Sequence, residues 1–404
     1  LLFPAPAAAS DRRTYRPDFC HSLALLFVRE KTILNLRQTT SFVQFNNVLN
    51  SCGRENIMRR KLIPLLALCM LLFSGCVQNT RNSYDVPDNY SVGIIRTNGS
   101  RNSSDILYFD ANLSQTGSIH YDYATMGELF YPPVIYDGSL YIVPQGQANK
   151  KDEKTILRQD LDTFEQNEYY LDQIAIYGLS VDASAIFAAN NINQQSFINR
   201  IDRADGTVKT VTYDNSYISI VYSYQDKLYA FSSQSTPSGK NETLHCLDPI
   251  TLEELKRIDI SEFGCDVYSV TGVGDTLYFA PMVTSQDTFN QIVCAYDIST
   301  EEISTIKFSD DVFHLLNMDD KLYVTHGNLV TGEGTTLSVY EISTGKIDTY
   351  DLGVWIGQIA INDDYLYLMG TGRIAKYDLH TMKKEMETEI PLENGDYLSG
   401  IFTY

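Results

Sequence analysis

The chain has 404 residues, of which 44% are hydrophobic and 12% aromatic, and it carries 51 acidic against 31 basic residues. With 28 tyrosines and only 12 prolines, the composition excludes a disordered chain and supplies enough apolar material for a large core. The formal net charge of −20 excludes general nucleic-acid binding, because neutralising phosphates requires an excess of Lys and Arg.

The first predicted element lies at residues 58–75. Met58 is followed by three cations and then by twelve uncharged, mostly apolar residues, 62–73. Small residues come next, immediately before Cys76. A charged start, a short apolar stretch and small residues are typical of a secretory signal peptide. Twelve residues in a helix span about 18 Å, which is too short for a bilayer core of about 30 Å.

The sequence Leu-Phe-Ser-Gly-Cys at 72–76 resembles the lipobox of bacterial lipoproteins, whose cysteine is lipidated and becomes the mature N-terminus. The resemblance implies lipidation of Cys76, a lipidated tether over 76–89, and an extracytoplasmic protein anchored to the cell membrane. Two acyl chains suffice for stable anchoring. We expect residues 1–57 to be an upstream or non-native extension, with Met58 as the start. Residues 77–404 then hold 21 basic and 47 acidic residues, a net charge of −26.

From about residue 90 onward, one pattern recurs at intervals of 42 to 49 residues. Each copy begins with a polar turn and an apolar strand, and continues with an apolar run that ends in an acid before a further turn and strand. Both halves are typical of β-hairpins, and helical periodicity is almost absent. The aromatic residues of the first half are Tyr141, Phe187, Tyr229, Tyr278, Tyr323 and Tyr367, and the acids of the second half are Asp110, Asp160, Asp202, Asp248, Asp297, Glu341 and Asp378.

Four strands in roughly 45 residues, repeated along the chain, are the signature of a β-propeller. Seven acid-turn units occur against six complete turn-strand units, and the chain ends with an isolated apolar segment at 397–402. We therefore predict an all-β fold over 90–404, a seven-bladed β-propeller of four-stranded antiparallel blades. The C-terminal strand is expected to join the N-terminal blade, because closing the ring removes the last free sheet edges.

The acid-turn unit resembles the repeat of quinoprotein-type and YVTN-type propellers, most clearly at 297–303 and 341–347. Quinoprotein repeats usually carry a tryptophan after this turn, whereas Trp355 is the single tryptophan here. The vicinal cysteine pair that holds the quinoprotein cofactor is also absent. The resemblance therefore supports the ring but implies no cofactor.

The sequence shows no convincing catalytic or metal-binding grouping. The histidines of the mature region stand alone, and His314 on a predicted inner strand is interpreted as a satisfied core or surface histidine rather than a group that faces the central channel. The repeated acids are interpreted as caps of the following turn, with a metal-ligand ring as the alternative. Cys246, Cys265 and Cys294 are expected to be small buried residues, a Cys246–Cys265 disulfide being the alternative. We predict no metal.

Aromatic residues recur near the start of the predicted inner strands. This end of each strand shares a face of the ring with three long polar segments, 145–154, 232–243 and 281–291, which are predicted to be loops. Packing between blades is the favoured interpretation of the aromatics, and a rim that stacks on a sugar or grips a peptide is the alternative. The candidate ligand-binding residues are Tyr131, Tyr177, Tyr222, Tyr268, Phe313, Trp355 and Tyr397.

Together these features predict a lipid-anchored binding or scaffold protein. Its loop face would hold a carbohydrate, a peptide or a partner protein of the cell envelope, because variable loops on a rigid ring are common binding sites. The alternative is a propeller-type enzyme, a lactonase or a glycan-active hydrolase or lyase, with its site in the central channel. The fold alone does not distinguish the two.

Overall fold

The computed structural model describes residues 84–85, 87, 89–145, 154–237, 239–328, 331, 333–362 and 364–404. These residues fall within one unit, Thr80–Tyr404, and form β-strands without an α-helix. Within these ranges, no helix is long and apolar enough to cross a membrane. The predicted signal peptide and Cys76 lie outside the described residues.

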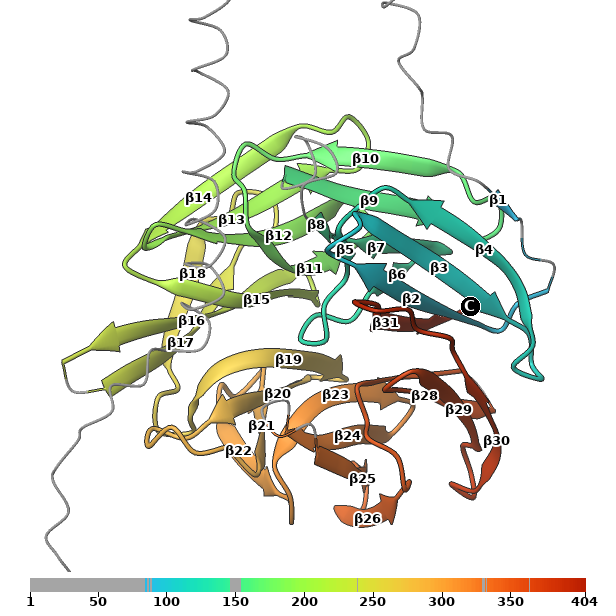
Figure 1. The fold of residues 1–404 in the computed structure, drawn as a ribbon. Coiled ribbons are helices and arrows are strands. Elements are labelled where there is room, and N and C mark those ends of the chain that lie inside the picture. Colours follow the sequence, from blue (N-terminus) through green and yellow to red (C-terminus); the bar gives the residue numbers. More distant parts are fainter. Residues whose placement is uncertain are drawn as a thin grey trace, which may run out of the picture. The chain divides into compact units, whose positions relative to one another are not determined.

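Seven antiparallel sheets follow one another along the chain as the blades of a β-propeller, as predicted (Figure 1). Blade 1 contains β1 (Tyr84–Asp85), β2 (Val92–Asn98), β3 (Ser103–Phe109), β4 (Gln115–Tyr121) and β31 (Tyr397–Thr403). Blade 2 contains β6 (Val134–Tyr136), β7 (Ser139–Ile142), β9 (Thr155–Asp160) and β10 (Gln166–Tyr170). Blade 3 contains β11 (Ile176–Val181), β12 (Ala185–Ile192), β13 (Gln195–Asp202) and β14 (Val208–Asp214). Blade 4 contains β15 (Tyr217–Tyr224), β16 (Lys227–Thr236), β17 (Gly239–Leu247) and β18 (Glu254–Asp259).

The remaining blades repeat the same strand order. Blade 5 contains β19 (Cys265–Val273), β20 (Thr276–Val283), β21 (Ile292–Asp297) and β22 (Ile303–Lys307). Blade 6 contains β23 (Val312–Met318), β24 (Lys321–Asn328), β25 (Glu333–Glu341) and β26 (Lys346–Asp351). Blade 7 contains β27 (Gln358–Ile361), β28 (Tyr365–Gly370), β29 (Arg373–Asp378) and β30 (Lys384–Glu389). A separate two-stranded sheet joins β5 (Thr125–Met126) to β8 (Pro144–Gln145).

Turn chemistry determines where the hairpins reverse. Asp137 and Gly138 both have positive φ, 49° and 64°, as the tight turn between β6 and β7 requires. At six of the seven acid-turn units an aspartate side chain caps the turn, as predicted, whereas the Glu341 carboxylate accepts the Thr344 hydroxyl. Asp297 Oδ1, for example, accepts the amide hydrogens of Ser299 and Thr300 at 2.9 and 2.7 Å. The Thr300 amide bond lowers the pKa of Asp297, because it stabilises the ionised carboxylate.

Among the described residues, the core is divided into seven hydrophobic clusters, and each lies between two consecutive blades. The repeated aromatic residues of the second strands supply much of it, since Tyr141, Phe187 and Tyr367 are completely buried. Cys246, Cys265 and Cys294 are buried free thiols, so the alternative of a Cys246–Cys265 disulfide was wrong. Because each blade buries both of its faces, no blade forms a core alone.

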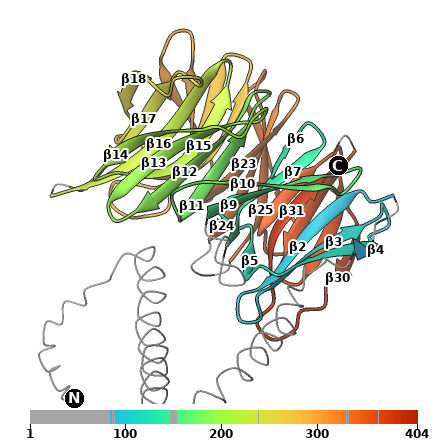
Figure 2. The same ribbon diagram turned by 90° about the horizontal axis from the view of Figure 1, so that it is seen from above.

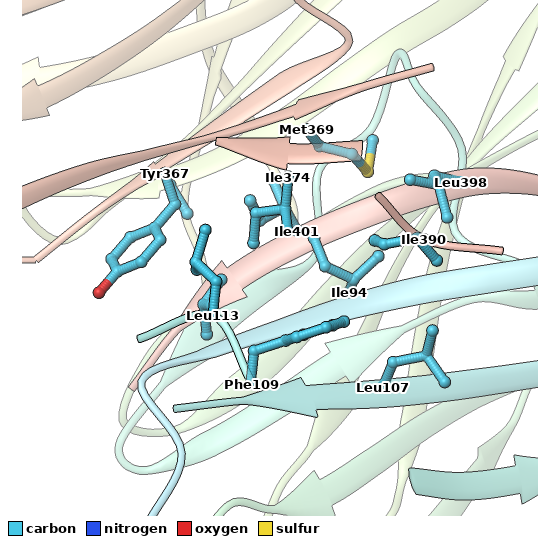
Figure 3. Close-up of a cluster of buried hydrophobic side chains, with 12 residues drawn as sticks. Ile94, Leu107, Phe109, Leu113, Tyr367, Met369, Ile374, Ile390, Leu398 and Ile401 are labelled. Atoms are coloured by element: carbon cyan, nitrogen blue, oxygen red, sulfur yellow. The ribbon is translucent and has the colours of Figure 1, made fainter. Parts of the chain in front are cut away.

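The C-terminal strand belongs to the first sheet. β31 pairs antiparallel with β2 from Thr97↔Tyr397 to Val92↔Thr403. A hydrophobic cluster then joins this sheet to blade 7 (Figure 3). In it, Ile94 and Phe109 of blade 1 pack with Tyr367 and Met369 of blade 7. The last and first blades are thus in direct contact.

The ring has two faces. The loop face carries the connections between blades and the hairpins between second and third strands, and the turn face carries the capped acid turns. Segment 232–243, expected to be a loop, is instead strand on both sides of its tip, because β16 and β17 pair out to Thr236↔Gly239. The neighbouring strands stop earlier, at Tyr217↔Ser233 and Thr243↔Asp259. Residues 234–241 therefore project as a two-stranded ribbon (Figures 1 and 2).

Candidate functional site

The connection from blade 1 to blade 2 crosses the centre of the loop face. It comprises residues 122–133, whereas the other connections between blades have two to seven residues. Its central segment, residues 127–131, contacts the first strands of blades on different sides of the ring. His314 Nε2 of β23 donates to the Leu129 carbonyl at 2.7 Å, and Gln358 Nε2 of β27 donates to the carbonyls of Glu128 and Leu129 at 3.0 and 3.1 Å. The centre of the ring is thus filled by the chain itself.

Aromatic rings complete the contacts of the central segment. Phe130 packs against Tyr268 and Phe313, with ring centroids 5.1 and 5.9 Å apart. Tyr131 lies 6.0 Å from Tyr177 and 5.9 Å from Tyr268. Such spacings are favourable for aromatic pairs. Four of the seven predicted aromatics are therefore brought together around a residue, Phe130, that the sequence reasoning did not include.

The other three predicted aromatics lie apart from this cluster. Tyr222 packs between blades 4 and 5, and its hydroxyl accepts the Gly272 amide hydrogen at 3.1 Å. Trp355 is half-buried in the connection to blade 7. Tyr397 opens β31 and is 43% exposed. Packing accounts for the contacts of the buried aromatic residues. Ligand binding by the seven predicted aromatic residues stays a prediction.

Glu128 is the acidic residue of the central segment. Burial raises the pKa of its carboxyl to about 7, because desolvation disfavours the charged form. No cation offsets this cost within the part of the chain that the structure describes. The sequence reasoning missed Glu128, which lies in no repeat; the available signal was the unusual length of the connection around it. A carboxyl poised near neutral pH is typical of a functional site.

A narrow cavity adjoins the central segment, with a volume of about 30 Å³. That is room for one or two water molecules. Its walls combine an apolar side with a few polar groups. They are formed by Gly127, Glu128, Tyr131, Pro132, Pro133, Tyr141, Ile142, Val143, Gln145, Ile176, Tyr177, Gly178 and Leu179.

A second cavity, of about 160 Å³, lies beside the hairpin between β2 and β3 and is almost entirely polar. Its two arginines are engaged with carboxylates. Arg96 bonds to Asp105 at 2.8 Å, and Arg101 bonds to Asp396 at 2.9 Å. The Arg96–Asp105 pair joins β2 to β3, and the Arg101–Asp396 pair ties the segment before β31 to blade 1, so this cavity has a structural explanation.

His314 and the repeated acids have structural partners as well. His314 is buried, and burial lowers its pKa to about 4, so it is neutral and donates to Leu129 as a core histidine, as predicted. The described residues contain no group of three or more His, Cys, Asp or Glu side chains arranged to hold a metal ion.

A different buried carboxyl lies at the base of the projecting ribbon. Glu242 is completely buried, and its Oε2 lies 2.5 Å from Ser233 Oγ and 3.1 Å from the Asp266 amide nitrogen. Ser233 Oγ also lies 3.0 Å from Asp266 Oδ1, and Lys240 Nζ donates to Asp266 at 2.8 Å. Burial, with the Asp266 charge adding to it, raises the pKa of Glu242 to about 8. This network joins the ribbon to blade 5.

Comparison with known proteins shows the fold alone. No protein-family model matches the chain, and no curated protein does so. Among solved structures, a functionally unknown protein from Desulfotomaculum acetoxidans DSM 771 is similar, with a TM-score of 0.53 and 10% identity over 74% of this chain and 95% of that one. BamB from Moraxella catarrhalis has a TM-score of 0.46 and 12% identity, covering 79% of this chain and 100% of its own. Apo AztD from Citrobacter koseri has a TM-score of 0.46 and 9% identity, covering 78% and 98%.

Proposed function

We propose that this propeller is a binding or scaffold protein whose loop face holds a peptide or a partner protein. The observation that carries the proposal is the central segment, which crosses the ring on a broad face; the cavity beside the segment holds about 30 Å³, and the polar cavity beside the β2–β3 hairpin about 160 Å³. Pockets for small ligands usually have volumes of roughly 300–1,000 Å³. A macromolecule that spreads over this face suits it better than a carbohydrate, the third class expected from the sequence.

The projecting ribbon supports a protein or peptide partner. The described residues of the ribbon extend beyond the pairing of both flanking strands of blade 4, although the Lys240 carbonyl accepts from the Cys265 thiol of blade 5. Exposed strand edges offer hydrogen bonds to an extended chain. The Glu242 network fixes the base of the ribbon, which reduces the entropy lost on binding.

A direct test places a photo-crosslinking amino acid on either face of the full-length protein in its own cells. Ser235 and Asn193 are exposed positions on the loop face, and Thr300 and Ala204 are exposed positions on the turn face. We expect discrete adducts from the loop-face positions only. Equal adducts from both faces, or adducts from the turn face alone, would contradict the proposal.

We further propose that the protein is anchored outside the cytoplasm through lipidated Cys76, and that its repeats are related to those of quinoprotein and YVTN propellers. The lipobox-like sequence supports the anchor. Replacing Cys76 with Ala should release the protein into the medium, whereas Cys69→Ala, within the same apolar stretch, should leave it in the membrane fraction. Membrane retention of the Cys76 variant would refute lipidation.

An enzymatic function, such as that of a lactonase or a glycan-active hydrolase or lyase, is the second candidate. Glu128 is the observation that favours it, because general acids and bases work best with a pKa near the operating pH. If Glu128 is catalytic, the wild-type protein should hydrolyse at least one compound in a panel of lactones and glycans, and Glu128→Gln should lose this activity. Turnover that survives this substitution would remove Glu128 from any catalytic role.

A further inference from the structure

The cavity beside the central segment has a chemically mixed wall. Pro132, Ile142 and Leu179 contribute apolar surface, whereas Glu128 and Gln145 contribute polar groups. The space of about 30 Å³ matches a group the size of a water molecule at the end of a slender apolar chain. A pyranose ring or a nucleobase is too large for it.

The carboxyl of Glu128 has no hydrogen-bond or ion-pair partner among the described residues, whereas its backbone carbonyl accepts from Gln358. The titratable groups around it are neutral at pH 7. They are Tyr131 and Tyr397, whose pKa values are raised by burial and further by the Glu128 charge, and His314, which bonds to the adjacent carbonyl. A carboxylate in such surroundings lacks a counter-ion.

Two tyrosine residues line the same cavity as Glu128. Tyr131 and Tyr177 both line the cavity, and their ring centroids are 6.0 Å apart. Aromatic faces attract cations through their quadrupole, and the attraction is larger where water is excluded. The tyrosine rings and the Glu128 carboxylate therefore both favour a cationic ligand group.

We propose that this cavity binds a primary ammonium group, with Glu128 as its counter-ion and Tyr131 and Tyr177 as its aromatic walls. A primary ammonium is close to water in size, and the apolar wall accommodates the methylene groups behind it. The net charge of −26 over residues 77–404 attracts cations toward the molecule. The inference deepens the proposed binding function and rests on it: the partner on the loop face would present a lysine side chain or another primary amine.

The test is a titration of the full-length protein with n-butylammonium at pH 8, followed by calorimetry or by NMR. We expect saturable binding, at least tenfold weaker affinity in Glu128→Gln, and weaker affinity at pH 5.5, where Glu128 is protonated. n-Butanol, which has a similar volume and no charge, should not compete. Absence of saturable binding at pH 8, or equal affinity in Glu128→Gln, would overturn the proposal.

Two further variants keep the result interpretable. Tyr177→Leu retains the carboxyl and should also weaken binding, whereas Glu302→Gln, an exposed position on the turn face, should bind as the wild type does. Competition by a blocked Gly-Lys-Gly peptide would assign the site to a lysine side chain, and competition by free amines alone would assign it to a small amine. The crosslinking contrast between the two faces is independent of this result, so the two proposals can fail separately.

Discussion

Two glutamates, Glu128 half-buried and Glu242 completely buried, illustrate how the same chemical group is used differently in two regions of this propeller. Both carboxyls have raised pKa values, about 7 for Glu128 and about 8 for Glu242. Glu242 is enclosed by Ser233 and Asp266 in a network that joins two blades. Glu128 lines a cavity and has no side-chain partner among the described residues.

Burial keeps Glu242 protonated, and the hydroxyl of Ser233 accommodates that proton. This hydroxyl lies within hydrogen-bond distance of two carboxyl groups but has a single hydrogen to donate. A neutral Glu242 supplies the second hydrogen, so the three groups form one hydrogen-bonded chain through Glu242 Oε2, while Glu242 Oε1 has no partner among the described residues. Glu128 is kept neutral by desolvation alone, which stabilises no neighbour. Raised pKa values therefore indicate function only where the group lacks a structural partner.

Removing the carboxyl of Glu242 should have the largest effect on the free energy of unfolding. Glu242→Ala empties a buried site and leaves Ser233 and the Asp266 amide without their partner. We expect the free energy of unfolding to fall by about 3 kcal/mol at pH 6.5. Urea denaturation measures it, with Glu302→Ala as an exposed control that changes it by less than about 0.5 kcal/mol. A loss equal to that of the control would show that the network contributes nothing.

Removing the carboxyl of Glu128 should raise the free energy of unfolding at high pH, the opposite of the effect expected at Glu242. The folded pKa of Glu128, about 7, lies above its ordinary value, so the folded state holds a proton that the unfolded state lacks between these values. Wild-type stability therefore falls as pH rises from about 4.5 to about 7. Glu128→Gln should be more stable than wild type by about 1–2 kcal/mol at pH 8 and equal at pH 4.5. Chemical denaturation at both pH values checks this, and a destabilised variant at pH 8 would mean that Glu128 has a structural partner.

The smallest expected effect on the free energy of unfolding concerns Ser233, which bridges the carboxyls of Glu242 and Asp266. Ser233→Ala removes one hydroxyl from the Glu242–Asp266 network and should lower the free energy of unfolding by about 1 kcal/mol. Ser235→Ala, at an exposed position on the same strand, is the matched control. If the two variants have the same midpoint in denaturant, the hydroxyl does not couple the carboxyls.

The repeats could be predicted because each depends on neighbours in the chain. The capped turn at Asp297 involves contacts within five residues. The continuous apolar run around Tyr367 reflects a strand that is buried on both faces. The central segment could not be predicted in this way. Leu129 accepts from His314, 185 residues away, and no local pattern around Glu128 indicates that contact. The ribbon at 234–241 was mistaken for a loop because its polar composition resembles one.

The amino-acid sequence by itself determined the number and order of the blades, since turn residues and alternating apolar residues act over a few positions each. Only the tertiary structure decided what occupies the centre of the loop face. There, desolvation by residues from several blades gives Glu128 its raised pKa, and packing against Phe130 gathers aromatics that are far apart in the chain. Burial is a property of the whole ring, and no single repeat carries it.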